Sequence, residues 1–295
     1  MSSIVVSDLA YSPPGAEQLF FDVSFTVSPG EHAVIVGANG TGKSTILRIL
    51  SGEYEPDDGE FAVGGTFLTM TQDVGMSRPD MPLREMLITV APAALRAAGG
   101  ALFAAERRML SGEDDGMEFA EALATWGDLG GYDLETQWAS SAQRSVKTPV
   151  TDFASRLVGE LSGGERKRLV LDLLLNSGAD VLLLDEPDNY LDIPTRRWLE
   201  EQLRACRSTV LMVSHDREVL DAVATKVITL EGSGCWVHGG PWRTYADARA
   251  ARQEQLGDAL KQWNDEERRL FHHMKIMKQR AAQNFKNATK ANAAE

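Results

Sequence analysis

The sequence predicts an α/β protein, in which strands and helices alternate along the chain. Two observations carry this prediction. Short apolar runs at residues 31–36 and 181–185 are each followed within a few residues by a helical pattern, and a further apolar run lies at residues 208–214. A glycine-rich loop joins the first run to the helical stretch "KSTILRILSG". Alternation of this kind is typical of α/β domains.

The first half of the chain contains strands, then a mostly helical region. "FFDVSFTVSPGEHAVIVG" predicts two strands around a Pro-Gly turn, the second at residues 31–36. The following helix is expected to end at Gly52, and "GTFLTMTQD" is expected to form another strand. After two prolines, residues 83–156 are rich in Ala and Leu and predict helices, with a turn at residues 111–116 and an end at Gly130–Gly131.

The second half returns to the α/β pattern. Leu169–Leu175 and Arg196–Ala205 are expected to be helical, on either side of a buried strand at residues 181–185. A second buried strand follows, and then a hairpin around Gly232–Gly234. From about Tyr245 onward the pattern predicts one long, charged helix.

Composition excludes several classes of protein. The chain has 295 residues, and no apolar run approaches the length of about 18–20 residues that spans a bilayer. The start, "MSSIVVSDLA", lacks the basic and apolar regions of a signal peptide. The two cysteines, Cys206 and Cys235, lack metal-ligand spacing. We therefore expect small buried thiols in a reducing cytoplasm.

Charge is unevenly distributed along the chain. The net charge of −13 argues against general nucleic-acid binding. Residues 268–290, however, hold seven basic residues and no acidic one, which leaves −20 for the remainder. This basic segment predicts either a local contact with a polyanion or a solvated face of a coiled coil.

The glycine-rich loop has the spacing of a phosphate-binding loop. "GANGTGKS" matches G-x-x-x-x-G-K-[ST], and it lies between a predicted strand and a predicted helix. Its glycines allow backbone N–H groups to face phosphate oxygens, Lys43 would reach the β- and γ-phosphates, and Ser44 would hold Mg²⁺. The residues expected to bind the nucleotide here are Gly37, Ala38, Asn39, Gly40, Thr41, Gly42, Lys43, Ser44 and Thr45.

The stretch "VLLLDEPDNYLD" places four carboxylates at the end of a buried strand: Asp185, Glu186, Asp188 and Asp192. A carboxylate at this position can orient Mg²⁺, so we predict that Asp185 is a metal ligand. Glu186 is expected to point to the other side of the strand and to activate a water as general base. Asp188 has no assigned role and is expected either to cap the following helix or to face solvent.

A third motif, "LSGGERKR", lies between these two. Ser162, Gly163, Gly164 and Glu165 precede or begin a predicted helix. Such residues offer a hydroxyl and backbone N–H groups to an anion, although the same pattern also starts ordinary helices.

Together with "SHD", these motifs resemble the ATPase domain of ATP-binding cassette (ABC) proteins over about residues 4–245. The resemblance implies a P-loop fold with an antiparallel β subdomain, a helical subdomain and ATP with Mg²⁺ as cofactors. It implies that Gln72 helps to ligate Mg²⁺ near the attacking water and that His215 contacts the γ-phosphate. Tyr11 would stack on adenine, although Phe20 and Phe21 compete for this role and Tyr11 could equally be a core residue.

"DEPDNYLD" followed by "SHDR" resembles the ABC-F subfamily, although Asp188 and Tyr190 replace the usual Thr and His. The resemblance implies a protein without a membrane domain that acts on the ribosome, as a translation factor or in antibiotic resistance. The helices near residues 102–134 resemble the subfamily's short arm. Residues 249–295 resemble part of its basic linker, after an ABC domain at residues 1–248 with its helical subdomain and arm at about 80–160.

Members of this subfamily carry two ABC domains, and ATP binds between the P-loop of one and the LSGGE of the other. Ser162, Gly163, Gly164, Glu165 and Asp192 would therefore serve a partner domain's nucleotide. The partner belongs either to the same longer chain or to a second copy in a homodimer. Three other functions stay open: the ATPase subunit of a membrane transporter, an ATP-driven assembly or DNA-maintenance module, and a scaffold without catalysis.

Overall fold

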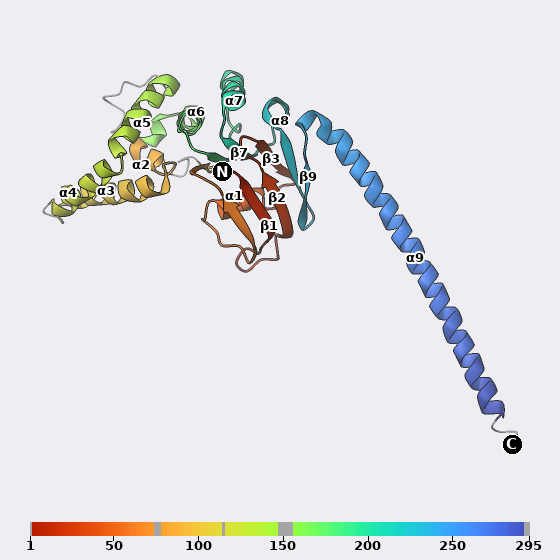
Figure 1. Ribbon diagram of the computed structural model, residues 1–295. Helices are drawn as coiled ribbons and strands as arrows, with labels where there is room; N and C mark the ends of the chain where they lie inside the picture. The colour runs from red at the N-terminus through yellow and green to blue at the C-terminus, as the bar shows by residue number, and fades with distance from the viewer. Residues whose placement is uncertain (1, 74–77, 114–115, 147–155, 292–295) are drawn as a thin grey trace. The chain divides into compact units, whose positions relative to one another are not determined.

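The computed structural model describes residues 2–73, 78–113, 116–146 and 156–291, with side chains as far as Lys278. The chain divides into two units, Met1–Arg243 and Thr244–Glu295. Sheets and short helices form the first unit, and most of a long helix forms the second (Figure 1). This architecture confirms the predicted α/β class.

A six-stranded sheet forms the centre of the first unit. Its strand order is β5-β6-β7-β3-β8-β9, and neighbouring strands are parallel except for β8 and β9. The strands are β5 (Phe67–Met70), β6 (Val181–Asp185), β7 (Thr209–Val213), β3 (His32–Gly37), β8 (Lys226–Glu231) and β9 (Gly234–His238). Since β5, β6, β7 and β3 run in parallel, their carboxyl ends share one edge, which is where α/β sheets bind ligands.

A second, antiparallel sheet has the order β2-β1-β4. It consists of β1 (Ile4–Tyr11), β2 (Phe20–Val27) and β4 (Asp58–Val63). The two strands predicted around the Pro-Gly turn both form, but β2 belongs to this sheet and β3 to the other. The turn therefore connects two sheets rather than closing a hairpin.

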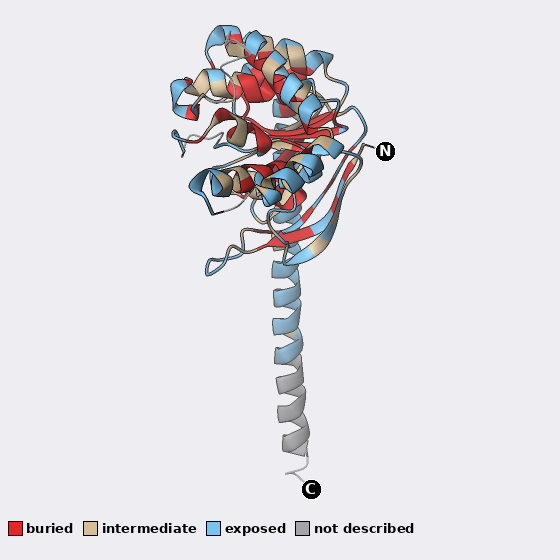
Figure 2. Ribbon diagram, turned by 90° about the vertical axis from the view of Figure 1, so that its left-hand side faces the viewer, coloured by how far each residue is buried: buried red, intermediate tan, exposed pale blue. Residues whose placement is uncertain are grey.

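The core lies between the two sheets and the first helix, α1 (Lys43–Leu50). Every residue of β6 and β7 is buried, as expected for strands covered on both faces (Figure 2). The other helices of this part of the unit are α6 (Gly163–Leu175), α7 (Ile193–Ala205), α8 (Arg217–Val223) and the short 3₁₀ turn η2 (Val158–Glu160). The predicted helices at 169–175 and 196–205 are thus confirmed, each with an earlier start.

The region predicted to be helical forms four helices that group together in Figure 1: α2 (Leu83–Ile88), α3 (Ala93–Ser111), α4 (Met117–Asp128) and α5 (Gly131–Val146). The turn predicted between residues 111 and 116 separates α3 from α4. The break at Gly130–Gly131 is also confirmed, since α4 ends at Asp128 and α5 begins at Gly131. Arg144 at the end of α5 pairs with the buried Asp172 of α6 at 2.6 Å. The part of the predicted region at 147–155 lies outside the described residues.

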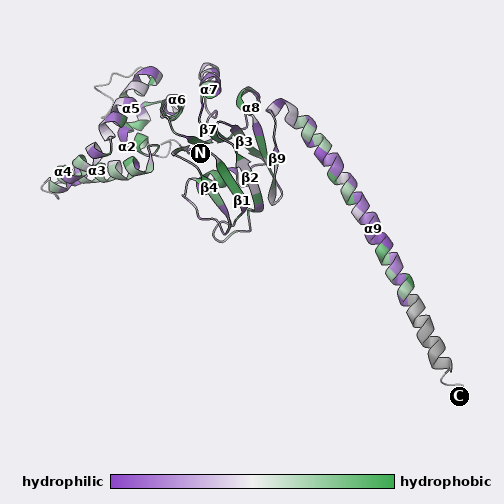
Figure 3. Cartoon of the chain, viewed as in Figure 1, coloured by the Kyte–Doolittle hydropathy of each residue, from purple (hydrophilic) through white to green (hydrophobic). Residues whose placement is uncertain are grey.

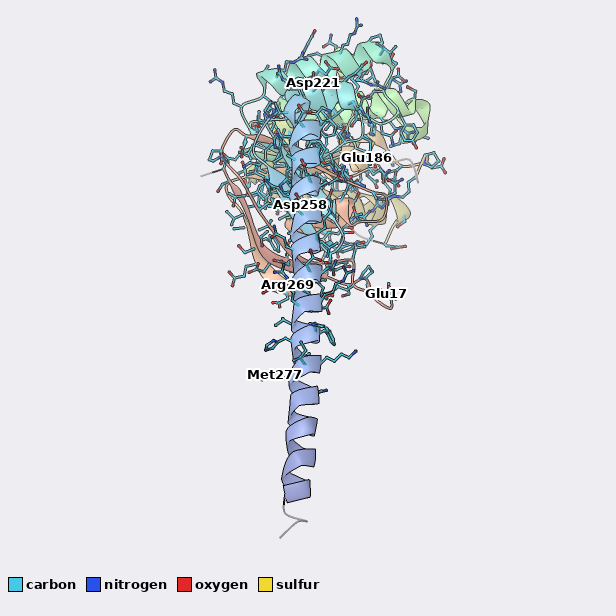
Figure 4. All side chains as sticks on the ribbon, turned by 90° about the vertical axis from the view of Figure 1, so that its right-hand side faces the viewer. Glu17, Glu186, Asp221, Asp258, Arg269 and Met277 are labelled. Carbon is cyan, nitrogen blue, oxygen red and sulfur yellow. The ribbon has the colours of Figure 1, made fainter. Side chains whose placement is uncertain are left out.

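The last helix, α9 (Trp242–Ala291), is 50 residues long, as the charged pattern predicted. Hydrophilic and hydrophobic residues are interspersed along the part of α9 whose side chains are described (Figure 3). Asp258, Arg269 and Met277 are labelled on this helix in Figure 4. The described side chains of α9 are mostly exposed. Among the described residues, no helix is both long and apolar enough to cross a membrane. The predicted boundary at residue 248 falls within α9, whereas the two units divide after Arg243.

Candidate functional site

The glycine-rich loop connects β3 to α1, at the carboxyl edge of the parallel strands. Gly42 has a φ of 93°, and a Cβ there would lie 2.7 Å from the Phe20 ring. Only glycine fits such a position without strain. The loop is closed by the Thr41 hydroxyl, which donates to the Ala38 carbonyl at 3.0 Å. The predicted strand, loop and helix are therefore all present.

Lys43 and Ser44 begin α1 and turn toward the strand ends. The Lys43 ammonium donates to the carbonyls of Gly37 at 3.1 Å and Ala38 at 2.8 Å. Burial lowers the pKa of Lys43, against the attraction of Glu186 and Asp185. The Ser44 hydroxyl donates to Asp185 Oδ1 at 3.0 Å. Ser44 and Asp185, two of the three predicted metal ligands, thus touch although they lie far apart in the sequence.

Asp185 is the last residue of β6 and is 5% exposed. Burial raises the pKa of its carboxyl group, while the Ser44 hydroxyl opposes the shift and the neighbouring Glu186 adds to it. A hydroxyl, a carboxylate and the Gln72 amide are oxygen donors of the kind that Mg²⁺ prefers. The residues present at this edge therefore fit a magnesium ion beside a nucleotide.

Glu186 follows β6 directly and has a φ of 49°, in the left-handed region. This conformation costs a residue other than glycine roughly 1–2 kcal/mol, and such strain gathers at functional sites. Its carboxylate accepts hydrogen bonds from Gln72 Nε2 at 2.8 Å and Asn189 Nδ2 at 3.1 Å. Gln72 follows β5, the neighbour of β6, so the paired strands bring it to the predicted base.

Both expectations stated for Asp188 are wrong. The side chain is 7% exposed, so it does not face solvent, and the residue that caps α7 is Asp192, whose carboxylate accepts from the Thr195 amide at 3.0 Å. Asp188 Oδ1 has no hydrogen-bond partner among the described residues. Burial raises the pKa of the Asp188 carboxyl group, and the nearby Asp216 raises it further. Hydrogen bonds from the backbone of Asp188 and from Ser214 lower this pKa and so oppose the shift.

Lys167 and Asn189 belong to the same cluster but were not predicted. Lys167, on α6, is 3% exposed, and its ammonium donates to the carbonyls of Glu186 at 2.5 Å and Asn189 at 2.9 Å. Burial lowers its pKa to about 8, although Asp188, Glu186 and Asp185 counteract this. The sequence held a signal, because Lys167 lies three and four residues before Val170 and Leu171, on the buried stripe of the helix.

The LSGGE motif starts α6 with a capping box. The Ser162 hydroxyl accepts from the Glu165 amide at 3.3 Å, and the Glu165 carboxylate accepts from the Ser162 amide at 2.9 Å. The same carboxylate accepts from the Ser162 hydroxyl at 2.7 Å, and these bonds lower the pKa of Glu165. Gly163 and Gly164 form the first turn, with exposed or half-buried backbone. The motif is thus a helix start whose N–H groups lie at an accessible end.

His215 follows β7 and is exposed. With Glu186 and Asp188 it lines an open hollow of about 350 Å³. Tyr11, in contrast, is 8% exposed and its ring stacks on Tyr54 at 5.7 Å between centroids. The structure therefore favours the core alternative for Tyr11, and it buries Phe20 as well, whereas Phe21 is 49% exposed.

Comparison with known proteins places this geometry in a family. The family model described as "ABC transporter" matches residues 20–189, which is more than half of the chain. The chain belongs to the ABC transporter family. The match contains the glycine-rich loop, the LSGGE motif and the acids Asp185, Glu186 and Asp188, and the Ser44–Asp185 hydrogen bond joins the loop to the first of these acids.

Two relatives and one solved structure refine the assignment of this ABC domain. It is 41% identical to an "Antibiotic resistance protein" of Mycobacteroides abscessus, over 100% of this chain and 54% of that protein. It is 32% identical to the "Energy-dependent translational throttle protein EttA" of Mycobacterium tuberculosis, over 81% of this chain and 42% of that protein. The chain thus spans about half the length of these curated relatives, which confirm the ABC-F resemblance.

The fold is also similar to that of a nucleotide-free ATP-binding cassette from an ABC transporter. The TM-score is 0.57 at 17% identity, and the match covers 81% of this chain and 92% of the other. At this identity the likeness confirms the fold alone.

Proposed function

We propose that the chain is an ATPase domain of an ABC-F protein that acts on the ribosome, with ATP and Mg²⁺ as cofactors. One observation carries the catalytic part of the proposal. Ser44 of the phosphate-binding loop donates to Asp185 at 3.0 Å, and the next residue, Glu186, is held by Gln72 at 2.8 Å. A loop for phosphate, oxygen ligands for a cation and a positioned carboxylate are the parts that phosphoryl transfer to water requires.

In this proposal each residue has a defined task. The backbone N–H groups of residues 37–45 and the Lys43 ammonium bind the phosphates, and Ser44, Asp185 and Gln72 would hold Mg²⁺, which neutralises charge that develops on the phosphate oxygens. Glu186 accepts a proton from the attacking water, and Gln72 and Asn189 orient its carboxylate. His215 lines the same hollow and contacts the γ-phosphate. Adenine would stack on an exposed aromatic, and Phe21 is 49% exposed whereas Tyr11 is buried.

A second ABC domain completes the site in this proposal. At the accessible start of α6, which comprises Ser162, Gly163, Gly164 and Glu165, the N–H groups of Gly163 and Gly164 would face a nucleotide held by the partner domain. The Ser162 and Glu165 amides already donate within the capping box. Asp192 is exposed at the start of α7 and faces the same partner. The partner is a second ABC domain of a longer chain or a second copy of this one.

The ribosomal part of the proposal is supported by the relatives. One is named for antibiotic resistance and the other as a translational throttle protein. The basic segment of α9 would contact RNA phosphates, as Lys and Arg side chains do in RNA-binding proteins. Such a protein works in the cytoplasm.

The Glu186→Gln variant tests this proposal. The amide retains the size of the side chain but cannot accept the proton, so ATP should stay bound and the two ABC domains should stay closed around it. We expect the variant to sediment with ribosomes more strongly in the presence of ATP than in its absence. The matched control is Glu201→Gln, which changes an exposed glutamate of α7 and should behave as the parent protein.

Equal amounts of the Glu186→Gln variant in the ribosome-free fraction, with and without ATP, would contradict the ribosomal role. Purification of the protein with an integral membrane partner would favour the transporter alternative instead.

A further inference from the structure

Lys167 is a buried lysine that none of the sequence motifs accounts for. It is 3% exposed, and both of its described hydrogen bonds go to main-chain carbonyls, those of Glu186 and Asn189. Burying an ammonium is costly unless hydrogen bonds and opposite charges compensate. Asp188, Glu186 and Asp185 supply that charge. The free-energy cost of burying the Lys167 ammonium indicates that this lysine has a role of its own.

The two carbonyls bracket the loop that carries the proposed base. Glu186 and Tyr190 have φ values of 49° and 63°, so the five residues 186–190 contain two left-handed residues other than glycine. The Glu186 amide donates to the Val213 carbonyl of β7 at 2.9 Å, but the backbone bonds between residues of this loop are long. The Asn189 amide donates to the Glu186 carbonyl at 3.3 Å, and the Leu191 amide donates to the Asp188 carbonyl at 3.4 Å. The charged bonds from Lys167, at 2.5 and 2.9 Å, are shorter and stronger.

We propose that Lys167 is a positioning residue for the ATPase reaction, which fixes the backbone of Glu186 and ties it to α6. The inference rests on the proposed function. Lys167 contacts no reacting atom; it acts by holding the main chain from which the Glu186 carboxylate projects. Because Ser162 caps the same helix five residues earlier, any displacement of α6 by a partner's nucleotide moves the Glu186 carbonyl with it. A displacement at the start of α6 is thereby transmitted to Glu186, the proposed base, within the same domain.

The Lys167→Met variant tests the inference in the full chain. Methionine fills similar volume without donors, so the Glu186 backbone loses both bonds. A misplacement of about 1 Å can lower a rate about 100-fold, and we expect kcat for Mg-ATP to fall about 10- to 100-fold with KM unchanged. Lys167→Arg retains charge and several donors and should recover most of kcat. Lys167→Gln retains a polar group, but its side chain is one atom too short to reach the two carbonyls, so its kcat should fall as in Lys167→Met. If the Met variant does not fold, the Gln variant tests the inference in its place.

Lys226→Met is the matched control. Lys226 is also mostly buried, with 14% of its side chain exposed, and donates to the Thr26 carbonyl at 2.8 Å and to Glu31 at 2.6 Å, at the start of β8. It should lower the melting temperature by a similar amount and leave kcat unchanged. The inference is wrong if Lys167→Met and Lys167→Gln retain the parental kcat, or if Lys226→Met loses kcat equally.

Hydrogen exchange in the nucleotide-free chain gives a readout that does not depend on turnover. The amides of Asn189 and Leu191 should exchange faster in Lys167→Met than in the parent and in Lys226→Met. Unchanged exchange at both amides would overturn the inference. If the parent protein does not hydrolyse Mg-ATP, the proposed function fails, while the exchange data still decide whether Lys167 holds the loop.

Discussion

At the scale of single residues, the four acids of "DEPDNYLD" have separate environments. Asp185 is buried against Ser44, Glu186 is held by two amide groups, and Asp192 caps a helix at the surface. Asp188 differs from these three, because it is buried and its Oδ1 atom has no hydrogen-bond partner among the described residues. Burial and the neighbouring Asp216 raise its pKa and outweigh the attraction of Lys167, so on balance the charged form of Asp188 lowers stability.

We predict that Asp188→Asn raises the melting temperature at pH 7.5. A carboxyl group whose pKa is raised in the folded protein costs stability above that pKa, and the cost disappears as the pH falls toward the ordinary value of 3.8. The stability advantage of Asn over Asp should thus shrink as the pH is lowered from 7.5. Thermal melts of both proteins across this range measure it. An advantage that grows toward acid pH would contradict this account.

Sequence reasoning singled out Asp185, Glu186, Lys43 and Ser44 from their spacing in the motifs, and the structure brings Ser44 and Asp185 into contact. It could not place Asp188, since the environment of this residue depends on which side chains fold against it, and it missed Lys167 although the helical spacing from Val170 and Leu171 was a signal. A lysine between the arginines of "ERKR" looks like a solvated charge until α6 turns it inward.

At the scale of elements, the glycine-rich loop is the part most closely determined by sequence. Its glycines are required by the backbone and by close approach: Gly42 combines a φ of 93° with a Phe20 ring 2.7 Å from where a Cβ would lie. The neighbouring antiparallel sheet was less predictable, because the assignment of β2 and β3 to different sheets depends on long-range pairing with β1 and β7.

We predict that Gly42→Ala loses nucleotide binding. The added methyl group must displace Phe20 or distort the loop that presents its N–H groups. Gly52→Ala is the control, because Gly52 also has a positive φ, 76°, but nothing lies within 4 Å of its Cβ position. Binding of a fluorescent ATP analogue, together with thermal melts, separates the two. Equal affinity for Gly42→Ala and the parent would show that the loop is not the binding element.

At the scale of the whole molecule, charge distinguishes the two units. The basic residues after Glu267 lie on a helix whose described side chains are largely exposed, while the rest of the chain is strongly acidic. A segment of this kind contributes little to folding and is available for a polyanion. The sequence predicted both the helix and its charge, because exposed, periodic residues need no tertiary partner to be recognised.

The double variant Lys275→Gln with Lys278→Gln should weaken ribosome association and make it less sensitive to salt. Each phosphate contact that is lost reduces the slope of log affinity against log salt by about 1. Lys261→Gln, on the same helix but beside Asp258, is the control and should leave the slope unchanged. If the double variant keeps the parental slope, these lysines do not contact RNA phosphates and the basic segment is a solvated helix face.

The most direct test of the central claim is steady-state ATP hydrolysis by the protein with Mg²⁺, compared among the parent, Glu186→Gln and Asp188→Ala. The account predicts that Glu186→Gln lowers kcat by about 100-fold or more while ATP stays bound, since a general base contributes about 10²–10⁴-fold. It predicts that Asp188→Ala spares far more activity. Turnover by Glu186→Gln at the parental rate would contradict the assignment of Glu186 as the base and, with it, the site described above.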